Sequence, residues 1–266
     1  MTAGFLLTGQ VTPTGNLDMR LKDKTAIVTG GASGFGAGIV RKFVAEGARV
    51  MIADLNIEGA ESLQAELGKA TVSCRANVAK DEDVADMVEA AIQHLGHIDI
   101  LVNNAGTTHL PNQLEDISED DFDLVFAVNC KSVYLTSKYS MPHFKSRNSG
   151  VILNVASTAG ISPRPRLSWY NASKGWMNTA TKSMAIELAP MGIRVNAINP
   201  VAGETPLLEK FMGEDTPEIR AKFLSTIPLG RFSNAEDMGN VACFLCSDEA
   251  SMVTGVCMEV DGGRCI

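Results

Sequence analysis

The chain lacks the excess of positive charge and the long apolar runs that would direct it to nucleic acid or to a membrane. Lys and Arg total 23 against 31 for Asp and Glu, so the formal net charge is −8. An acidic protein has no electrostatic attraction for phosphodiesters or anionic lipids. No apolar run approaches the roughly 18 residues of a spanning helix. The opening residues MTAGFLLTGQ contain no Lys or Arg and do not resemble a signal peptide, so we expect a cytoplasmic protein without nucleic-acid or membrane partners.

Cysteine pairs and metal-ligand clusters are also missing. The six cysteines follow no spacing typical of a disulfide framework, and without a secretory signal they are expected to be reduced thiols. Cys243 and Cys246 form a CxxC pair, but they lie in an apolar helical stripe with no histidine nearby. Because free cysteine packs as a small hydrophobe, we expect these two in the core and predict no metal site.

What the chain does contain is a regular alternation of apolar runs with helical patterns. Runs that are apolar throughout indicate strands buried on both faces, as in a parallel sheet. Right-handed crossovers then predict an α/β, doubly wound Rossmann-like fold with about seven parallel strands and helices on both faces. The strands are expected at 25–29, 49–54, 70–76, 98–106, 150–157, 193–200 and 256–263, and a long helix at about 118–146. Residues 19–266 should form this single domain, with 1–18 as a weakly ordered N-terminal extension.

A glycine-rich segment, VTGGASGFGAGI, joins the first strand to the first helix. Its Gly30, Gly34 and Gly36 do not make the strict dinucleotide fingerprint, but glycines permit a tight turn and let a pyrophosphate approach the backbone at the helix N-terminus. Asp54 ends the second strand, where a carboxylate can bind an adenosine ribose and would repel a 2′-phosphate. The pattern therefore predicts a dinucleotide site that prefers NAD to NADP. The other residues expected in it here are Ser33, Phe35 and Leu55.

The segment WYNASKG places Tyr170 one helical turn before Lys174, so the two side chains share a face. Taken alone, this pair is typical of an amphipathic surface helix. Together with other motifs it resembles the short-chain dehydrogenase/reductase family over residues 21–263. The matching motifs are TGGASGFG, NNAG at 103–106, Asn129 in AVNCKSVY, Ser157 in LNVASTAG, the YxxxK of Tyr170 and Lys174, and DGG at 261–263.

The resemblance implies hydride transfer between a nicotinamide cofactor and a secondary alcohol or ketone. Tyr170 would be the acid–base group, and because a free tyrosine has a pKa of about 10, the positive charge of Lys174 would be needed to lower it. By the same resemblance, Lys174 also binds the nicotinamide ribose, Ser157 polarises the substrate oxygen, and Asn129 anchors a water that links Lys174 to solvent. The implied cofactor contacts are Asn77, Val78, Asn104, Ala105, Gly106, Tyr170, Lys174, Pro200 and Thr205.

The sequence departs from the family pattern in two places. Asn77 stands where the family often has aspartate, although an amide can still form hydrogen bonds to an adenine. Val201 follows Pro200 where the family usually has glycine. The loop after the sixth strand is therefore expected to take a different path, which leaves the contact of Thr205 open.

Three functions share these motifs. The leading one is an NAD-dependent alcohol dehydrogenase or carbonyl reductase. An NADPH-dependent 3-oxoacyl carrier-protein reductase is the closest alternative, although such enzymes commonly carry Arg or Lys at the position of Ser33. A non-catalytic dinucleotide-binding regulator would not need an acid–base group. The resemblance also implies a homotetramer assembled through the helices at about 118–146 and 170–189.

The substrate is not specified by these motifs. Residues 205–230 carry two short apolar helical runs and are expected to form a mobile lid with an apolar underside. Arg164 and Arg166 are candidate anchors for a carboxylate or phosphate, but a solvated or subunit-contact pair is the more common role of surface arginines. His109 is expected to be an exposed loop residue.

Overall fold

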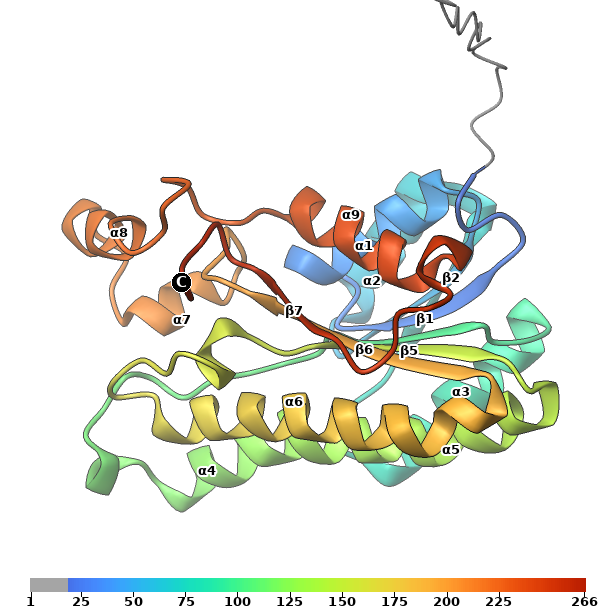
Figure 1. Cartoon of the computed structure of the whole chain (residues 1–266), viewed down its shortest axis with the longest axis horizontal. Helices are drawn as coiled ribbons and strands as arrows, with labels where there is room; N and C mark the ends of the chain where they lie inside the picture. Colours follow the sequence, from blue (N-terminus) through green and yellow to red (C-terminus); the bar gives the residue numbers. More distant parts are fainter. Residues whose placement is uncertain (1–18) are drawn as a thin grey trace, which may run out of the picture.

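The computed structural model describes residues 19–266, so the predicted extension at 1–18 lies outside the described residues. All seven strands are parallel and form one sheet in the order β3-β2-β1-β4-β5-β6-β7 (Figure 1). The predicted Rossmann-like sheet is therefore confirmed. The strands are β1 Thr25–Thr29, β2 Arg49–Asp54, β3 Thr71–Arg75, β4 Ile100–Asn103, β5 Gly150–Val155, β6 Ile193–Pro200 and β7 Cys257–Val260.

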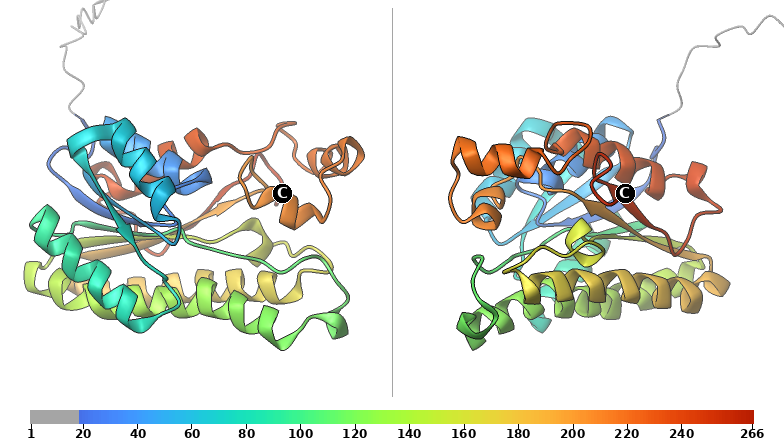
Figure 2. Two further views of the ribbon diagram at one scale, coloured as in Figure 1. Left: turned by 180° about the vertical axis from the view of Figure 1, so that it is seen from behind. Right: turned by 60° about the vertical axis from the view of Figure 1, so that its left-hand side comes forward.

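Helices cover both faces of the sheet, as Figures 1 and 2 show. One face carries α1 (Gly34–Ala45), α2 (Ile57–Leu67) and α9 (Ala235–Cys246), and the other carries α3 (Asp81–Leu95), α5 (Ser132–Arg147) and α6 (Ser168–Leu188). Each layer buries its own apolar core against the strands, for example Phe43 on the first face and Phe144 on the second. Cys243 and Cys246 pack in the first core as predicted. No helix within residues 19–266 is long and apolar enough to cross a membrane.

The long helix predicted at 118–146 is interrupted. α4 (Glu119–Phe126) and α5 are joined by a π-helical turn over Ala127–Lys131. A π turn holds one more residue than an α turn and is frequent at functional sites. Here it carries Asn129, which is fully buried and bonded to residues outside the helix. Helical periodicity alone could not indicate this interruption.

The two edges of the sheet differ. The order of strands reverses between β1 and β4, and in such folds ligands bind at the carboxyl ends of the strands beside this point. Beyond β6, α7 (Leu208–Met212) and α8 (Pro217–Leu224) project past the sheet (orange in Figure 1).

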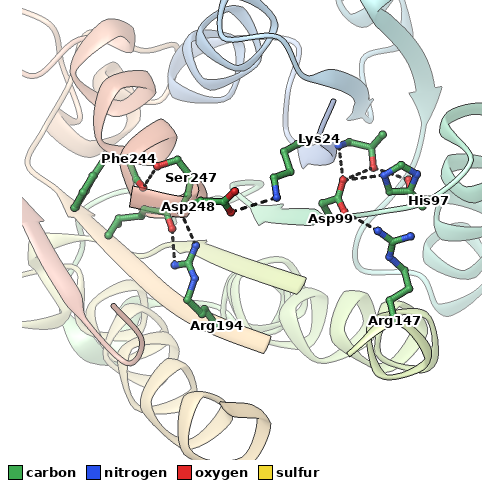
Figure 3. A network of polar contacts seen from close by, with 10 residues as sticks. Lys24, His97, Asp99, Arg147, Arg194, Phe244, Ser247 and Asp248 are labelled. Atoms are coloured by element: carbon green, nitrogen blue, oxygen red, sulfur yellow. Dashed lines mark hydrogen bonds and ion pairs between the residues drawn. The ribbon is translucent and has the colours of Figure 1, made fainter. Parts of the chain in front are cut away.

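The opposite, amino-terminal edge is closed by polar contacts (Figure 3). Asp99 accepts hydrogen bonds from the Thr25 N–H at 2.9 Å and from Arg147 at 3.0 Å. Arg194 donates to the carbonyl of Leu245 at 2.8 Å, and also to those of Ser247 and Val253. These charged groups satisfy one another or the backbone, so this edge holds the elements together.

Candidate active site

A cavity of about 530 Å³ opens at the carboxyl edge of the strands, a size typical of small-molecule sites. Every residue predicted to contact the cofactor lines it, and so do Ser157, Tyr170 and Lys174. Asn129 does not. The predicted cofactor residues in the lining are Gly30, Ser33, Gly34, Phe35, Gly36, Asp54, Leu55, Asn77, Val78, Asn104, Ala105, Gly106, Tyr170, Lys174, Pro200 and Thr205.

The glycine-rich turn between β1 and α1 is packed too closely for side chains. The amide of Asn104 donates to the carbonyls of Thr29 and Gly30, both at 2.9 Å. A Cβ at Gly36 would lie 2.0 Å from the carbonyl oxygen of Gly30, and Gly30 itself has φ of 61°. No side chain caps the start of α1, so its first N–H groups are available to a phosphate.

The carboxylate of Asp54 lies between the end of β2 and this turn. One oxygen accepts from the Ala32 N–H at 3.0 Å and the other from the Asn56 N–H at 2.9 Å. The adjacent Leu55 is exposed. The glycine-rich turn has room for a pyrophosphate next to its backbone, and the carboxylate of Asp54 is held beside it, where it can bind a ribose. The residues present therefore fit the dinucleotide cofactor that the sequence predicts.

Tyr170 and Lys174 lie on the first turns of α6 and are almost fully buried, with 5% and 4% of their surface exposed. The ammonium of Lys174 donates to the Val155 carbonyl at 2.8 Å and lies 5.9 Å from the centre of the Tyr170 ring. Burial raises the pKa of Tyr170 to about 12, although hydrogen bonding to Ser157 opposes this. Burial also lowers the pKa of Lys174 to about 8. Desolvation is the largest cause of both shifts, so the lysine alone does not bring the pKa of the tyrosine into a working range.

Ser157 follows β5 and is held on both sides. Its N–H donates to the amide oxygen of Asn199 at 3.2 Å, and its hydroxyl accepts from the Ala159 N–H at 3.1 Å. Its side chain lies close enough to Tyr170 to oppose the rise in the pKa of that tyrosine. The two hydroxyl groups that the sequence assigned to catalysis thus meet in the cavity.

Asn129 is tied into the protein by all of its amide atoms. Its nitrogen donates to the Thr107 carbonyl and to the Ser173 hydroxyl, both at 2.9 Å, and its oxygen accepts from the Thr107 N–H at 2.9 Å. The Ser173 hydroxyl in turn donates to the Tyr170 carbonyl at 2.7 Å. Asn129 therefore links the loop after β4 to the turn of α6 that carries Tyr170, which is a positioning role.

The loop after β6 returns to the glycine-rich turn. Gly203 pairs with Ser233 and packs against the ring of Phe35, where a Cβ would lie 2.2 Å from the ring. Thr205 lies beside Gly34. The departure at Val201 therefore still leaves Thr205 on the cavity.

The expectation that His109 is an exposed loop residue was wrong. His109 is 1% exposed, with its Nδ1 2.8 Å from the Leu110 carbonyl, because the loop after β4 folds back under the surface. Arg164 lines the cavity, whereas Arg166 is exposed and does not. An apolar wall of the cavity is made by Leu124, Leu167, Leu207, Phe211 and Phe223. Three of these residues lie in the 205–230 segment, for which the sequence predicted an apolar underside. Leu124 of α4 was not predicted to line the site.

Comparison with known proteins agrees with this geometry. The family model described as Enoyl-(Acyl carrier protein) reductase matches residues 30–264. This chain belongs to the short-chain dehydrogenase/reductase family. It is 50% identical over 251 residues to the 4-formylbenzenesulfonate dehydrogenase of Comamonas testosteroni, covering 92% of this chain and 99% of that protein.

Two further members of this family are similar along their whole length. A 3-oxoacyl-[acyl-carrier-protein] reductase of Thermotoga maritima is 40% identical over 253 residues, covering 93% of this chain and all of that protein. The crystal structure of a 3-ketoacyl-(acyl-carrier-protein) reductase from Brucella melitensis, complexed with NADH, superposes with a TM-score of 0.89 at 48% identity. It covers 92% of this chain and 100% of its own.

The burial of Lys174 should have a measurable cost in stability. Because its pKa is lowered from 10.5 to about 8 in the folded protein, its charge is unfavourable below pH 8, and this penalty fades as pH rises from 8 to 10.5. We expect Lys174→Met to raise the free energy of unfolding at pH 7 by about 2 kcal/mol, after allowing for the lost hydrogen bond to Val155. Urea unfolding at pH 7 and pH 10 should show that the difference in free energy of unfolding between Lys174→Met and the wild type is smaller at the higher pH. A difference that grows with pH would contradict this account.

Proposed function

We propose that this oxidoreductase uses NAD to interconvert a secondary alcohol and a ketone, with Tyr170 as the acid–base group. The observation that carries the proposal is that Ser157, Tyr170 and Lys174 line one cavity with the glycine-rich turn and Asp54. The cofactor, when bound, supplies or accepts the hydride. Gly34, Gly36 and Asp54 would hold its pyrophosphate and adenosine ribose.

The protein's own groups manage the proton. In reduction, the Ser157 hydroxyl donates a hydrogen bond to the carbonyl oxygen, and the Tyr170 hydroxyl transfers its proton to that oxygen. In oxidation, the Tyr170 phenolate accepts the proton of the alcohol. The ammonium of Lys174 stabilises that phenolate, and Asn129 fixes the turn on which both residues stand.

The preference for NAD rests on the charges of the cavity. Asp54 and Ser33 both line the cavity. A carboxylate at the end of the second strand would repel a 2′-phosphate, and Ser33 carries no positive charge that could attract one. The basic residues in the cavity lining are Lys174 and Arg164, and both stand away from Asp54: Lys174 bonds to Val155 and Arg164 stacks on Phe223. The Brucella relative holds NADH in its crystal structure.

The cofactor preference can be measured with both nucleotides. Because the Asp54 carboxylate would repel a 2′-phosphate, kcat/KM for NAD should exceed that for NADP by tenfold or more, a difference of about 1.4 kcal/mol. Asp54→Ser should lower the ratio of kcat/KM for NAD to kcat/KM for NADP. The control is Asp23→Ser, a substitution before the start of β1, which should leave this ratio unchanged. A wild-type ratio in favour of NADP would refute the assignment.

Tyr170→Phe tests the acid–base role directly. The substitution removes the hydroxyl and keeps the ring, so kcat should fall by a factor of about 10² to 10⁴, while NADH binding measured by fluorescence stays near the wild-type value. Tyr134→Phe is the matched control, since that tyrosine is 56% exposed. Wild-type turnover in the Tyr170 variant would exclude this mechanism.

Residues 205–230 form the proposed lid. α7 and α8 pack in a small cluster of their own around Leu208, Met212 and Ile227, and Phe211 places its ring 4.9 Å from that of Tyr170. A separate cluster that covers the catalytic residue suits a segment that closes over substrate. Amide exchange in 205–225 that is equally slow with and without ligands would contradict a lid.

We also propose that the protein is cytoplasmic and assembles as a homotetramer. Large apolar side chains are exposed along the outer helices at Tyr134, Trp176 and Ile186, and soluble oligomers commonly close through such self-complementary faces. A monomer mass in light scattering would contradict the assembly.

A carrier-protein reductase remains the second candidate. The Thermotoga and Brucella relatives carry that name. The two functions differ in substrate size, so a higher kcat/KM for a 3-oxoacyl carrier-protein thioester than for free ketones, measured with both NADH and NADPH, would favour it.

A further inference from the structure

Arg164, at the carboxyl edge of the sheet, differs from two arginines at the amino-terminal edge whose guanidinium groups are well satisfied. Arg147 at the amino-terminal edge pairs with a carboxylate, and Arg194 donates to three carbonyls. Within residues 19–266, Arg164 has no carboxylate in ion-pair distance, and the hydrogen bond its guanidinium makes is a long one, 3.4 Å, to the Thr226 hydroxyl. Most of its N–H groups are therefore free to bind something else.

The free guanidinium belongs to the catalytic cavity. Arg164 lines it together with Ser157 and Tyr170. Its carbonyl accepts a hydrogen bond of 2.7 Å from the side chain of Asn171, the residue after Tyr170. This hydrogen bond fastens the loop that carries the arginine to the helical turn that carries Tyr170.

The surroundings of Arg164 favour an anion. The guanidinium carbon lies 4.3 Å above the ring of Phe223. Burial, and then the nearby charge of Arg264, lower the pKa of Arg164 to about 10, so it remains protonated at neutral pH. Arg264 itself bonds to Ser162 and leaves its buried Nε without a partner. Two neighbouring cations without a carboxylate create a positive potential that an anionic ligand would relieve.

Apolar groups stand around this charged end. Phe211 packs edge-on against Tyr170 at 4.9 Å, Phe223 lies beneath Arg164, and Leu167 and Leu207 also line the cavity. A ligand that reaches from the Tyr170 hydroxyl to the Arg164 guanidinium would pass between apolar walls. Its middle part should therefore be aromatic or aliphatic.

We propose that Arg164 binds an oxyanion of the substrate, so that the substrate class is a carbonyl compound or alcohol whose reacting carbon is joined to a carboxylate or sulfonate by an apolar spacer. This inference rests on the proposed function of Tyr170 and names the substrate class for the same site. The Arg–oxyanion pair forms two parallel hydrogen bonds in its best geometry, so the arginine would select both the charge and the orientation of the ligand.

The test compares an anionic substrate with a neutral one of the same shape. Reduction of the ketones 4-acetylbenzoate and 4-acetylbenzamide is measured with NADH for the wild type, Arg164→Met, Arg164→Lys and the control Arg166→Met. Methionine keeps an apolar stem over Phe223 but removes the charge. We expect Arg164→Met to lower kcat/KM for the benzoate about 10- to 100-fold and to leave the benzamide nearly unchanged, with Arg164→Lys intermediate and Arg166→Met unchanged for both.

A binding measurement separates this inference from the catalytic proposal. Calorimetry in the presence of NADH uses 4-methylbenzoate and 4-methylbenzamide, which lack the reacting carbonyl. The wild type and Tyr170→Phe should both bind the benzoate about tenfold or more tightly than the benzamide, and Arg164→Met should lose this preference. If that preference appears without turnover of either ketone, the anion site stands and the proposed reaction is wrong for these compounds. Equal binding of the two probes by the wild type, or equal losses for both in Arg164→Met, would overturn the role of Arg164.

Discussion

The burial of a tyrosine and a lysine one helical turn apart is the constraint on which the site depends. Desolvation disfavours the charge on each group, so the pKa of Tyr170 is raised to about 12 and that of Lys174 is lowered to about 8. In this state both side chains favour their neutral forms more than they do in water. A further positive charge beside the phenolate, such as that of an oxidised nicotinamide, would shift the tyrosine in the opposite direction. The proposed acid–base group therefore stays protonated where no such charge is near it, and a cationic cofactor would favour its ionised form.

Hydrogen bonds from two asparagine side chains hold the segments around Tyr170 and Lys174 together at the carboxyl ends of the parallel strands. Asn104 holds the glycine-rich turn against β4, and Asn129 holds the loop after β4 against α6. Each amide bonds to the backbone or to a hydroxyl of a neighbouring element, so loss of either would loosen a different wall of the cavity. The amino-terminal edge instead satisfies its charges internally. Because the charged groups of the amino-terminal edge have partners within the protein, the guanidinium of Arg164 at the carboxyl edge, which lacks a carboxylate partner within residues 19–266, suggests an anionic ligand.

The sequence was sufficient to predict those features that depend on a repeating apolar pattern or on a fixed spacing between residues. The apolar runs predicted all seven strands, because a strand buried on both faces needs apolar residues throughout, and the Tyr170–Lys174 spacing placed both side chains in one cavity. The π turn at Ala127–Lys131, the burial of His109 and the placement of Arg164 arise from contacts between segments distant in sequence, which no local pattern records. The pKa of Tyr170 could not be predicted either, because the extent of its desolvation depends on Phe211 and the other side chains that pack around it.

The central claim is that Tyr170 is a buried acid whose ionisation depends on the cofactor. Its most direct test is the ultraviolet difference spectrum of tyrosinate between about pH 7 and pH 10, a range below the ordinary pKa of tyrosine, for the wild type and Tyr170→Phe, with and without NAD. Without NAD the two proteins should show the same signal, since Tyr170 stays protonated there. With NAD the wild type should show one additional tyrosinate that the variant lacks. Identical titrations of the two proteins in the presence of NAD would contradict the account.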